Sequence, residues 1–187
     1  MGKRYDALTD DQIGFIAAQP MFFVATAPDH GRINLSPKGM DSLRVLSASR
    51  ILWLNLTGSG NETAPHLAQD NRITLMWCSF GQRPLILRVY GTARALHRTA
   101  SDWAQLAACL PDQPGARQIV DVTIDLVQSS CGFAVPFMEH TADRPVLHDW
   151  AVGQGAAGLS KYWANRNSLT IDGQPSGIGA NLPESTS

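Results

Sequence analysis

Apolar and polar residues alternate along much of this chain with a period of two. In residues 117–128, for example, Val120 and Val122 share one face, while Asp121 and Thr123 share the other. Successive side chains of a β-strand point to opposite faces of a sheet, so this pattern predicts a strand. Similar patterns or short apolar runs predict further strands over residues 21–27, 32–36, 43–46, 51–56, 72–78 and 85–96.

Helical signals interrupt the strands in four places. Thr9 and Gln12 form a capping-box pattern ahead of Ile13, so a helix should begin there and end before Pro20. Shorter helices are expected near residues 63–69, 101–109 and 159–167. Gly91, inside a long predicted strand, indicates a β-bulge or bend. Many short strands with few helices predict a mostly β fold, an antiparallel barrel of six or seven strands.

The chain length fits one domain with an elaborated end. Of the 187 residues, we assign 1–150 to the barrel domain and 151–174 to a helical extension that packs on the barrel or on a dimer partner. Residues 175–187 read as a flexible tail. The segment 130–138 is apolar yet broken by glycine and proline, which is typical of a segment covered by a partner subunit or a ligand.

Composition argues against several classes of function. The 15 basic and 16 acidic residues nearly balance and form no basic block, so nucleic acid and anionic membranes are poor partners. No apolar run approaches the roughly 20 residues of a membrane span, and the N-terminus lacks a signal-peptide core, so we expect a cytoplasmic protein. Three widely separated cysteines, Cys78, Cys109 and Cys131, favour reduced thiols over a zinc site or a disulfide framework.

The segment from Thr57 to Thr63 is the strongest candidate for a ligand site. It follows the apolar run at 51–56, contains two glycines and several hydroxyl or amide side chains, and leads into a helix with Pro65 in its first turn. Free N–H groups at a helix start attract phosphate. The same residues also suit a plain connection between a strand and a helix, since the motif lacks the lysine of a Walker sequence.

The remaining reactive side chains favour structural roles. We interpret His66 as a solvated or packing histidine, and Cys131 as a small buried thiol, because no base is spaced to activate it. His140 and His148 lie near acidic residues, but their spacing matches no metal-ligand pattern, so no metal site is predicted. Asp121 belongs to what reads as an exposed strand face.

The order of several short motifs resembles the pyridoxamine 5'-phosphate oxidase-like family of FMN-binding split barrels, and a bacterial branch of it rather than its named enzyme. The resemblance covers about residues 15 to 130. Its motifs are Phe22 to Thr26, Asn34 to Gly39, Thr57 to Thr63, Leu67 to Asn71, Arg72 to Met76 and Leu87 to Ala93.

This resemblance implies a homodimer that holds FMN in a groove between two barrels. The strand that ends at Lys38 would lie beside the isoalloxazine ring, with Lys38 or Arg44 as the nearby cation, and Trp77 or Trp163 would wall the ring. The polar loop would contact the phosphate. The implied cofactor-binding residues are Ser36, Pro37, Lys38, Arg44, Thr57, Gly58, Ser59, Gly60, Asn61, Thr63 and Trp77.

Two departures separate this chain from the named oxidase. Glu62 and Thr63 stand where that enzyme carries an Arg-Lys pair, and its arginine-rich C-terminal motif is missing here. Oxidation of pyridoxamine phosphate is therefore not the expected activity. The resemblance implies either an FMN-dependent oxidoreductase for another small molecule or a non-catalytic carrier or sensor that binds a flavin, a deazaflavin or haem.

Overall fold

The eight strands that the structure describes belong to one antiparallel sheet. The computed structural model describes residues 2–182, which include four α-helices and one 3₁₀ helix. The mostly β antiparallel barrel predicted from the sequence is confirmed, with eight strands in place of six or seven. In chain order the elements are β1 (Lys3–Tyr5), α1 (Asp10–Ala17), β2 (Phe22–Thr26), β3 (Asn34–Lys38), β4 (Leu43–Ser47), β5 (Arg50–Leu56), α2 (Thr63–Gln69), β6 (Arg72–Cys78), β7 (Ile86–Leu96), α3 (Trp103–Ala107), β8 (Ala116–Ser130), α4 (Val146–Arg166) and η1 (Ile178–Asn181).

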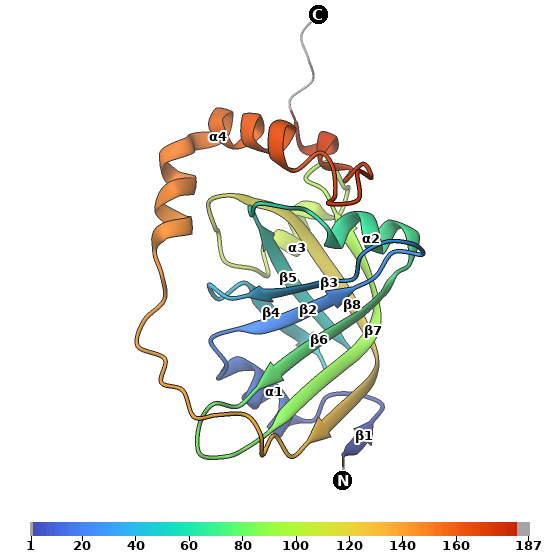
Figure 1. The fold of residues 1–187 in the computed structure, drawn as a ribbon, viewed down its shortest axis with the longest axis vertical. Helices are drawn as coiled ribbons and strands as arrows, with labels where there is room; N and C mark the ends of the chain where they lie inside the picture. Colours follow the sequence, from blue (N-terminus) through green and yellow to red (C-terminus); the bar gives the residue numbers. More distant parts are fainter. Residues whose placement is uncertain (1, 183–187) are drawn as a thin grey trace, which may run out of the picture.

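The barrel is split between β3 and β4. The strand order is β3-β2-β6-β7-β8-β5-β4, with β1 paired to β8 outside this path. β3 and β4 are thus the two ends of the sheet, and among the described strands they do not pair, although only residues 39–42 connect them. Figure 1 shows the curled sheet, with α2 and the end of α4 near one end of the barrel and α1 near the other. At this split, a ligand can reach β3 and the C-terminal end of β5.

Aromatic packing fills the barrel interior. The Phe22 ring stacks on Trp77 at 5.9 Å between centroids and meets Trp53 edge-on at 6.1 Å. Both tryptophans are essentially fully buried, together with Ile16 from α1 and Val24 from β2. Inward-facing residues of five strands therefore form a core that fixes the position of β5, the strand paired with β4 at the split.

β7 bends at Gly91. The β7–β8 register shifts between Tyr90 and Gly91, and a Cβ atom at position 91 would lie 2.0 Å from the carbonyl oxygen of Thr123. Only glycine permits this approach. The bulge predicted from the sequence is confirmed.

Asp121 itself is buried, in contrast to the prediction of an exposed position. Its carboxylate accepts hydrogen bonds from Arg50 at 2.8 and 3.0 Å and from Arg94 at 3.2 and 2.9 Å. Burial alone would raise the pKa of Asp121, but these hydrogen bonds hold it below its usual value. The neighbouring Thr123 and Asp125 are exposed, as predicted. The side chains of Arg50 from β5 and Arg94 from β7 thus cover Asp121 of β8.

The C-terminal segment wraps one end of the barrel. α4 is interrupted at Gly155, whose φ of 60° and ψ of −178° are not helical, and its two halves run in different directions (Figure 1). A β-bridge between Leu169 and Pro175 and the helix η1 follow, and Ile178 is 1% exposed. Residues 175–182 are therefore packed rather than part of the flexible tail expected from the sequence, while 183–187 lie outside the described residues.

A membrane-spanning helix is not found between residues 2 and 182, because none of the helices there is both long and apolar enough.

Candidate functional site

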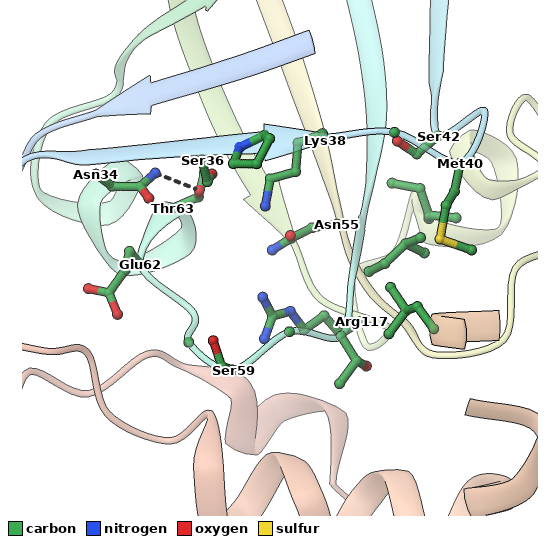
Figure 2. A pocket seen from close by; sticks show the side chains of 18 residues that line it. Asn34, Ser36, Lys38, Met40, Ser42, Asn55, Ser59, Glu62, Thr63 and Arg117 are labelled. Carbon is green, nitrogen blue, oxygen red and sulfur yellow. Dashed lines mark hydrogen bonds between the residues drawn. The ribbon is translucent and has the colours of Figure 1, made fainter. Parts of the chain in front are cut away.

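A cavity of about 400 Å³ lies at the split of the barrel. β3, residues 39–42, the C-terminal end of β5, the loop at 57–62 and the start of β8 form its walls, and Leu147 of α4 borders it. Figure 2 shows Lys38, Asn55 and Arg117 converging on its centre from β3, β5 and β8. The cavity has the size of a site for a cofactor or small substrate.

The loop at 57–62 is anchored at its first residues. Thr57 donates to the carbonyl of Gly115 through its backbone amide at 2.9 Å and its hydroxyl at 2.6 Å. Trp163 Nε1 donates to Thr57 Oγ1 at 2.8 Å, and Asn167 Nδ2 donates to the Gly58 carbonyl at 3.0 Å. Within residues 2–182, the amides of residues 58–61 have no hydrogen-bond acceptor. These amides are available to a ligand that accepts hydrogen bonds.

Arg117 is the most unusual residue of the cavity. It is only 3% exposed, and Nη1 donates to Asn167 Oδ1 at 2.6 Å, while Nε has no partner among the described residues. No carboxylate in the described part of the chain lies within ion-pair distance of its guanidinium. Burial lowers the pKa of Arg117 to about 10. Buried arginines are normally paired, so this cation indicates a missing anionic partner.

Lys38 supplies a second positive charge to the same cavity. Its Nζ lies 5.3 Å from the centre of the Trp53 ring, an attractive cation–π arrangement. Burial, followed by repulsion from Arg117, lowers the pKa of Lys38 to about 8. Two cations that repel each other inside one cavity are stabilised by a bound anion.

Glu62 lines the cavity but does not pair with these cations. Its carboxylate accepts the backbone amide of Ile171 at 3.1 and 3.3 Å. In Figure 2 this carboxylate points away from Lys38 and Arg117. The centre of the cavity therefore keeps its positive character.

Several buried polar atoms around the cavity have no partner within residues 2–182. Ser36 Oγ and Asn55 Oδ1 are examples, and both residues line the cavity. Asn55 Nδ2 donates to Gln118 Oε1 at 2.8 Å, and Gln118 Nε2 also has no partner. Unpaired buried polar atoms are uncommon in native proteins, and a bound polar ligand would satisfy them.

A hydrogen-bonded chain supports the other end of the cavity. Asn34 Nδ2 donates to Thr26 Oγ1 at 3.2 Å and to Thr63 Oγ1 at 3.4 Å, and Thr26 Oγ1 lies 3.1 Å from Nδ1 of His66. His66 is buried, so of the two roles predicted for it, solvated or packing, the structure shows packing. This chain fixes Asn34 and Thr63 against the cavity.

Most residues predicted from the sequence come together here. Those that line the cavity are Ser36, Pro37, Lys38, Thr57, Gly58, Ser59, Gly60 and Thr63. Three others do not. Asn61 is buried and does not line the cavity, Arg44 pairs with Asp41 at 2.6 Å, and Trp77 is 1% exposed in the core. Arg44 and Trp77 instead border a separate cavity beside α1. Trp77 stacks on Phe22, so it cannot wall a flavin ring at the split, and Trp163 is buried against Thr57.

Two central residues were not among the predicted ones, Asn55 and Arg117. Asn55 has a weak sequence signal, because it is the one polar residue in the apolar run at 51–56. Arg117 has none, because the alternation places it on the same strand face as Asp121 and Thr123, which reads as exposed. The pairing of β5 with β8 places Asn55 opposite Gln118, the neighbour of Arg117. Asn55 and Arg117 thereby reach the same cavity. Sequence distance hides this proximity.

The remaining reactive groups lie elsewhere. Cys131 is exposed, so the prediction of a buried thiol is wrong, because the chain leaves the sheet at Ser130 and no described element covers the next residue. His140 Nε2 lies 3.0 Å from Asp143, and His148 Nδ1 lies 3.2 Å from Asp149. In the described part of the chain, no three possible metal ligands cluster.

Sequence comparison relates the chain to known proteins. The family model described as "Pyridoxamine 5'-phosphate oxidase" matches residues 8–131. The pyridoxamine 5'-phosphate oxidase family protein ustO of Aspergillus flavus is 36% identical over 191 residues, which cover 91% of this chain and 76% of that protein. This relative is fungal, so the match gives no support to a bacterial branch in particular.

Comparison with solved structures shows the same fold. A Lactobacillus delbrueckii protein, described as a candidate pyridoxamine 5'-phosphate oxidase, has a TM-score of 0.54 and 22% identity over 66% of this chain and 94% of that one. A single-residue variant of HupZ from Group A Streptococcus has a TM-score of 0.50 and 20% identity over 65% of this chain and 98% of that one.

Proposed function

This chain belongs to the pyridoxamine 5'-phosphate oxidase family, and we propose that its cavity binds FMN in an oxidoreductase acting on a small molecule. One observation carries the proposal. Arg117 is a buried cation and Lys38 a partly buried one, and both face one cavity without an ion-pair partner among the described residues. The phosphate of FMN has the negative charge and the acceptor oxygens that would pair with both cations.

The residues present fit this cofactor. The guanidinium of Arg117 and the free amides of residues 58–61 would bind the phosphate. β3 from Ser36 to Lys38 would lie along the ring system, with Asn55 as a further polar contact. Arg117 also explains how the chain compensates for Glu62 and Thr63 in place of an Arg-Lys pair, since the positive charge comes from β8 instead of the loop.

The protein would contribute position and charge to the reaction. When bound, the flavin supplies the hydride or electron transfer itself. Lys38 would lie where its charge favours an anionic ligand, and Trp53 beneath it excludes water from one side. Among the described residues, Glu62 is the only carboxylate lining the cavity and no histidine lines it, so no acid or base is assigned to the chain.

We further propose a homodimer. Phe133, Phe137 and Met138 are large apolar residues that are more than half exposed, as are Ile33 and Leu35 on and beside the edge strand β3. Exposed apolar side chains of this size are typical of surfaces that a second subunit covers. Light scattering on the purified chain should give twice the mass of the monomer, and a strictly monomeric protein would contradict this part of the proposal.

The cofactor is tested by titration of the full chain with FMN and with riboflavin, which lacks the phosphate. We expect tight FMN binding, with an absorbance band at about 450 nm. Arg117→Met should weaken FMN binding about 10- to 100-fold, because charged hydrogen bonds are lost, and should change riboflavin binding little. Arg117→Lys should lie between, and Arg72→Met, which removes an exposed arginine, should match the wild type.

Failure to take up FMN in the wild type would contradict the proposal, as would equal losses for FMN and riboflavin in Arg117→Met. An enzyme is distinguished from a carrier by anaerobic addition of NADH or NADPH to the FMN-loaded protein. Bleaching of the band at about 450 nm supports the oxidoreductase. A loaded protein that no reductant bleaches, and that no small-molecule donor reduces, would favour the carrier.

A further inference from the structure

Apart from the cavity beside α1, a second cavity, of about 560 Å³, adjoins the first. Its apolar walls come from the residues just before β2, from the turn at 39–42 and from the first turns of α4. The residues concerned are Pro20, Met21, Met40, Val146, Leu147 and Trp150. Trp150 is held by an edge-to-face contact with Tyr162, at 5.0 Å between centroids, from the other half of α4. The aromatic wall is therefore fixed across the break at Gly155.

The two cavities share a boundary. Gly39, Met40 and Leu147 line both of them. Met40 and Asp41 have φ values of 60° and 53°, a left-handed conformation that residues other than glycine rarely adopt. Two consecutive residues of this kind are costly, and such strain concentrates at ligand clamps. The turn at 39–42 thus holds the Met40 side chain between the cofactor cavity and the apolar one.

The polar groups of the second cavity come from the segment before α4. His140 pairs with Asp143 at 3.0 Å, while Arg144 has no ion-pair partner within residues 2–182. Figure 1 shows this segment running along one side of the barrel into α4. An apolar cavity with one free positive charge at its rim suits an apolar ring system that carries an acidic group.

We propose that this second cavity is the substrate site, and that it accepts an aromatic or conjugated carboxylic acid whose rings contact Trp150 and Met40 and whose acidic group faces Arg144. The inference rests on the proposed function for the identity of the neighbouring ligand. It assigns the first cavity to the flavin and the second to the molecule that exchanges electrons with it.

The test uses two fluorescent probes on the full chain, the sulfonate 8-anilinonaphthalene-1-sulfonate and its neutral analogue N-phenyl-1-naphthylamine. Both should bind saturably at one site per chain, with and without FMN. Trp150→Ala should weaken both at least tenfold. Arg144→Gln should weaken only the sulfonate, by about two- to fivefold, because the charge is exposed. Ile171→Ala, which removes an exposed apolar side chain outside this cavity, serves as the control.

The FMN-loaded protein provides a second measurement. Because the cavities adjoin, the sulfonate probe should shift the visible absorption band of bound FMN in the wild type but not in Trp150→Ala. Probe binding without FMN binding would contradict the proposed function and retain the second cavity. The inference would be overturned by unsaturable probe binding or by equal binding to the wild type and Trp150→Ala. A change of oligomeric mass in Trp150→Ala would also overturn it, because a second copy of the chain would then fill this cavity.

Discussion

Lys38 should make the FMN-free protein less stable at neutral pH than at alkaline pH. Its folded-state pKa of about 8 lies below the ordinary value of 10.5. A base with a lowered pKa disfavours folding while it is charged, so the penalty is complete below pH 8 and disappears as the pH rises towards 10.5. At about 1.4 kcal/mol per pKa unit the full shift corresponds to roughly 3 kcal/mol, an upper value because the side chain is partly hydrated.

Replacing this lysine by methionine isolates its contribution. Lys38→Met should raise the free energy of unfolding of the FMN-free protein by about 1–3 kcal/mol at pH 7, and the difference from the wild type should vanish near pH 10. Urea unfolding at both pH values provides the measurement. Lys161→Met removes an exposed lysine of α4 and should show no such pH-dependent difference.

FMN should reverse the preference of Lys38 for its neutral form, because a doubly charged phosphate in the same cavity favours the charged amine. The affinity of the wild type for FMN should be highest between about pH 6.5, where the phosphate is doubly charged, and pH 8, and should fall by up to about tenfold per pH unit above that. Riboflavin binding should stay flat over this range. A Lys38→Met protein that is less stable than the wild type at pH 7, or that keeps the alkaline loss of FMN affinity, would refute the role assigned to Lys38.

Two further predictions concern the barrel itself. Gly91→Ala should lower the free energy of unfolding by at least about 3 kcal/mol in chemical denaturation, because the new Cβ would meet the Thr123 carbonyl, whereas Gly153→Ala, with nothing within 4 Å, should be neutral or mildly stabilising. Asp121→Asn should cost about 1–3 kcal/mol at pH 7, since Arg50 and Arg94 lose their shared carboxylate. Because the pKa of Asp121 is lowered, its stabilising contribution is present above the ordinary value of 3.8 and is lost as the pH falls. Asp121→Asn should therefore reduce the loss of unfolding free energy at acid pH. An acid loss equal to that of the wild type would contradict this role.

Local patterns were enough to predict most of the fold. Strands with a clear period of two, such as 117–128, and the bulge at Gly91 depend on neighbouring residues alone. β1 was missed because its three residues are polar and largely exposed, and only pairing with β8 makes them a strand. The packed residues 175–182 were missed for a similar reason, since Ile178 is buried by α4, which lies earlier in the chain.

The candidate site divides in the same way. Lys38 and the loop at 57–62 lie in contiguous motifs, so the sequence could indicate them. Arg117 reaches the cavity through the pairing of β8 with β5, a contact between distant segments. Trp77 suits a flavin site by residue type, but strand alternation turns it inward onto Phe22. Which tryptophan faces a ligand depends on tertiary packing that no short motif records.

A crystal structure of the full chain grown with FMN would test the central proposal most directly. We predict that the FMN phosphate lies within hydrogen-bond distance of the Arg117 guanidinium and of backbone amides between Gly58 and Asn61, with the ring beside Lys38. A phosphate bound elsewhere, with Arg117 still lacking an anionic partner, would contradict it.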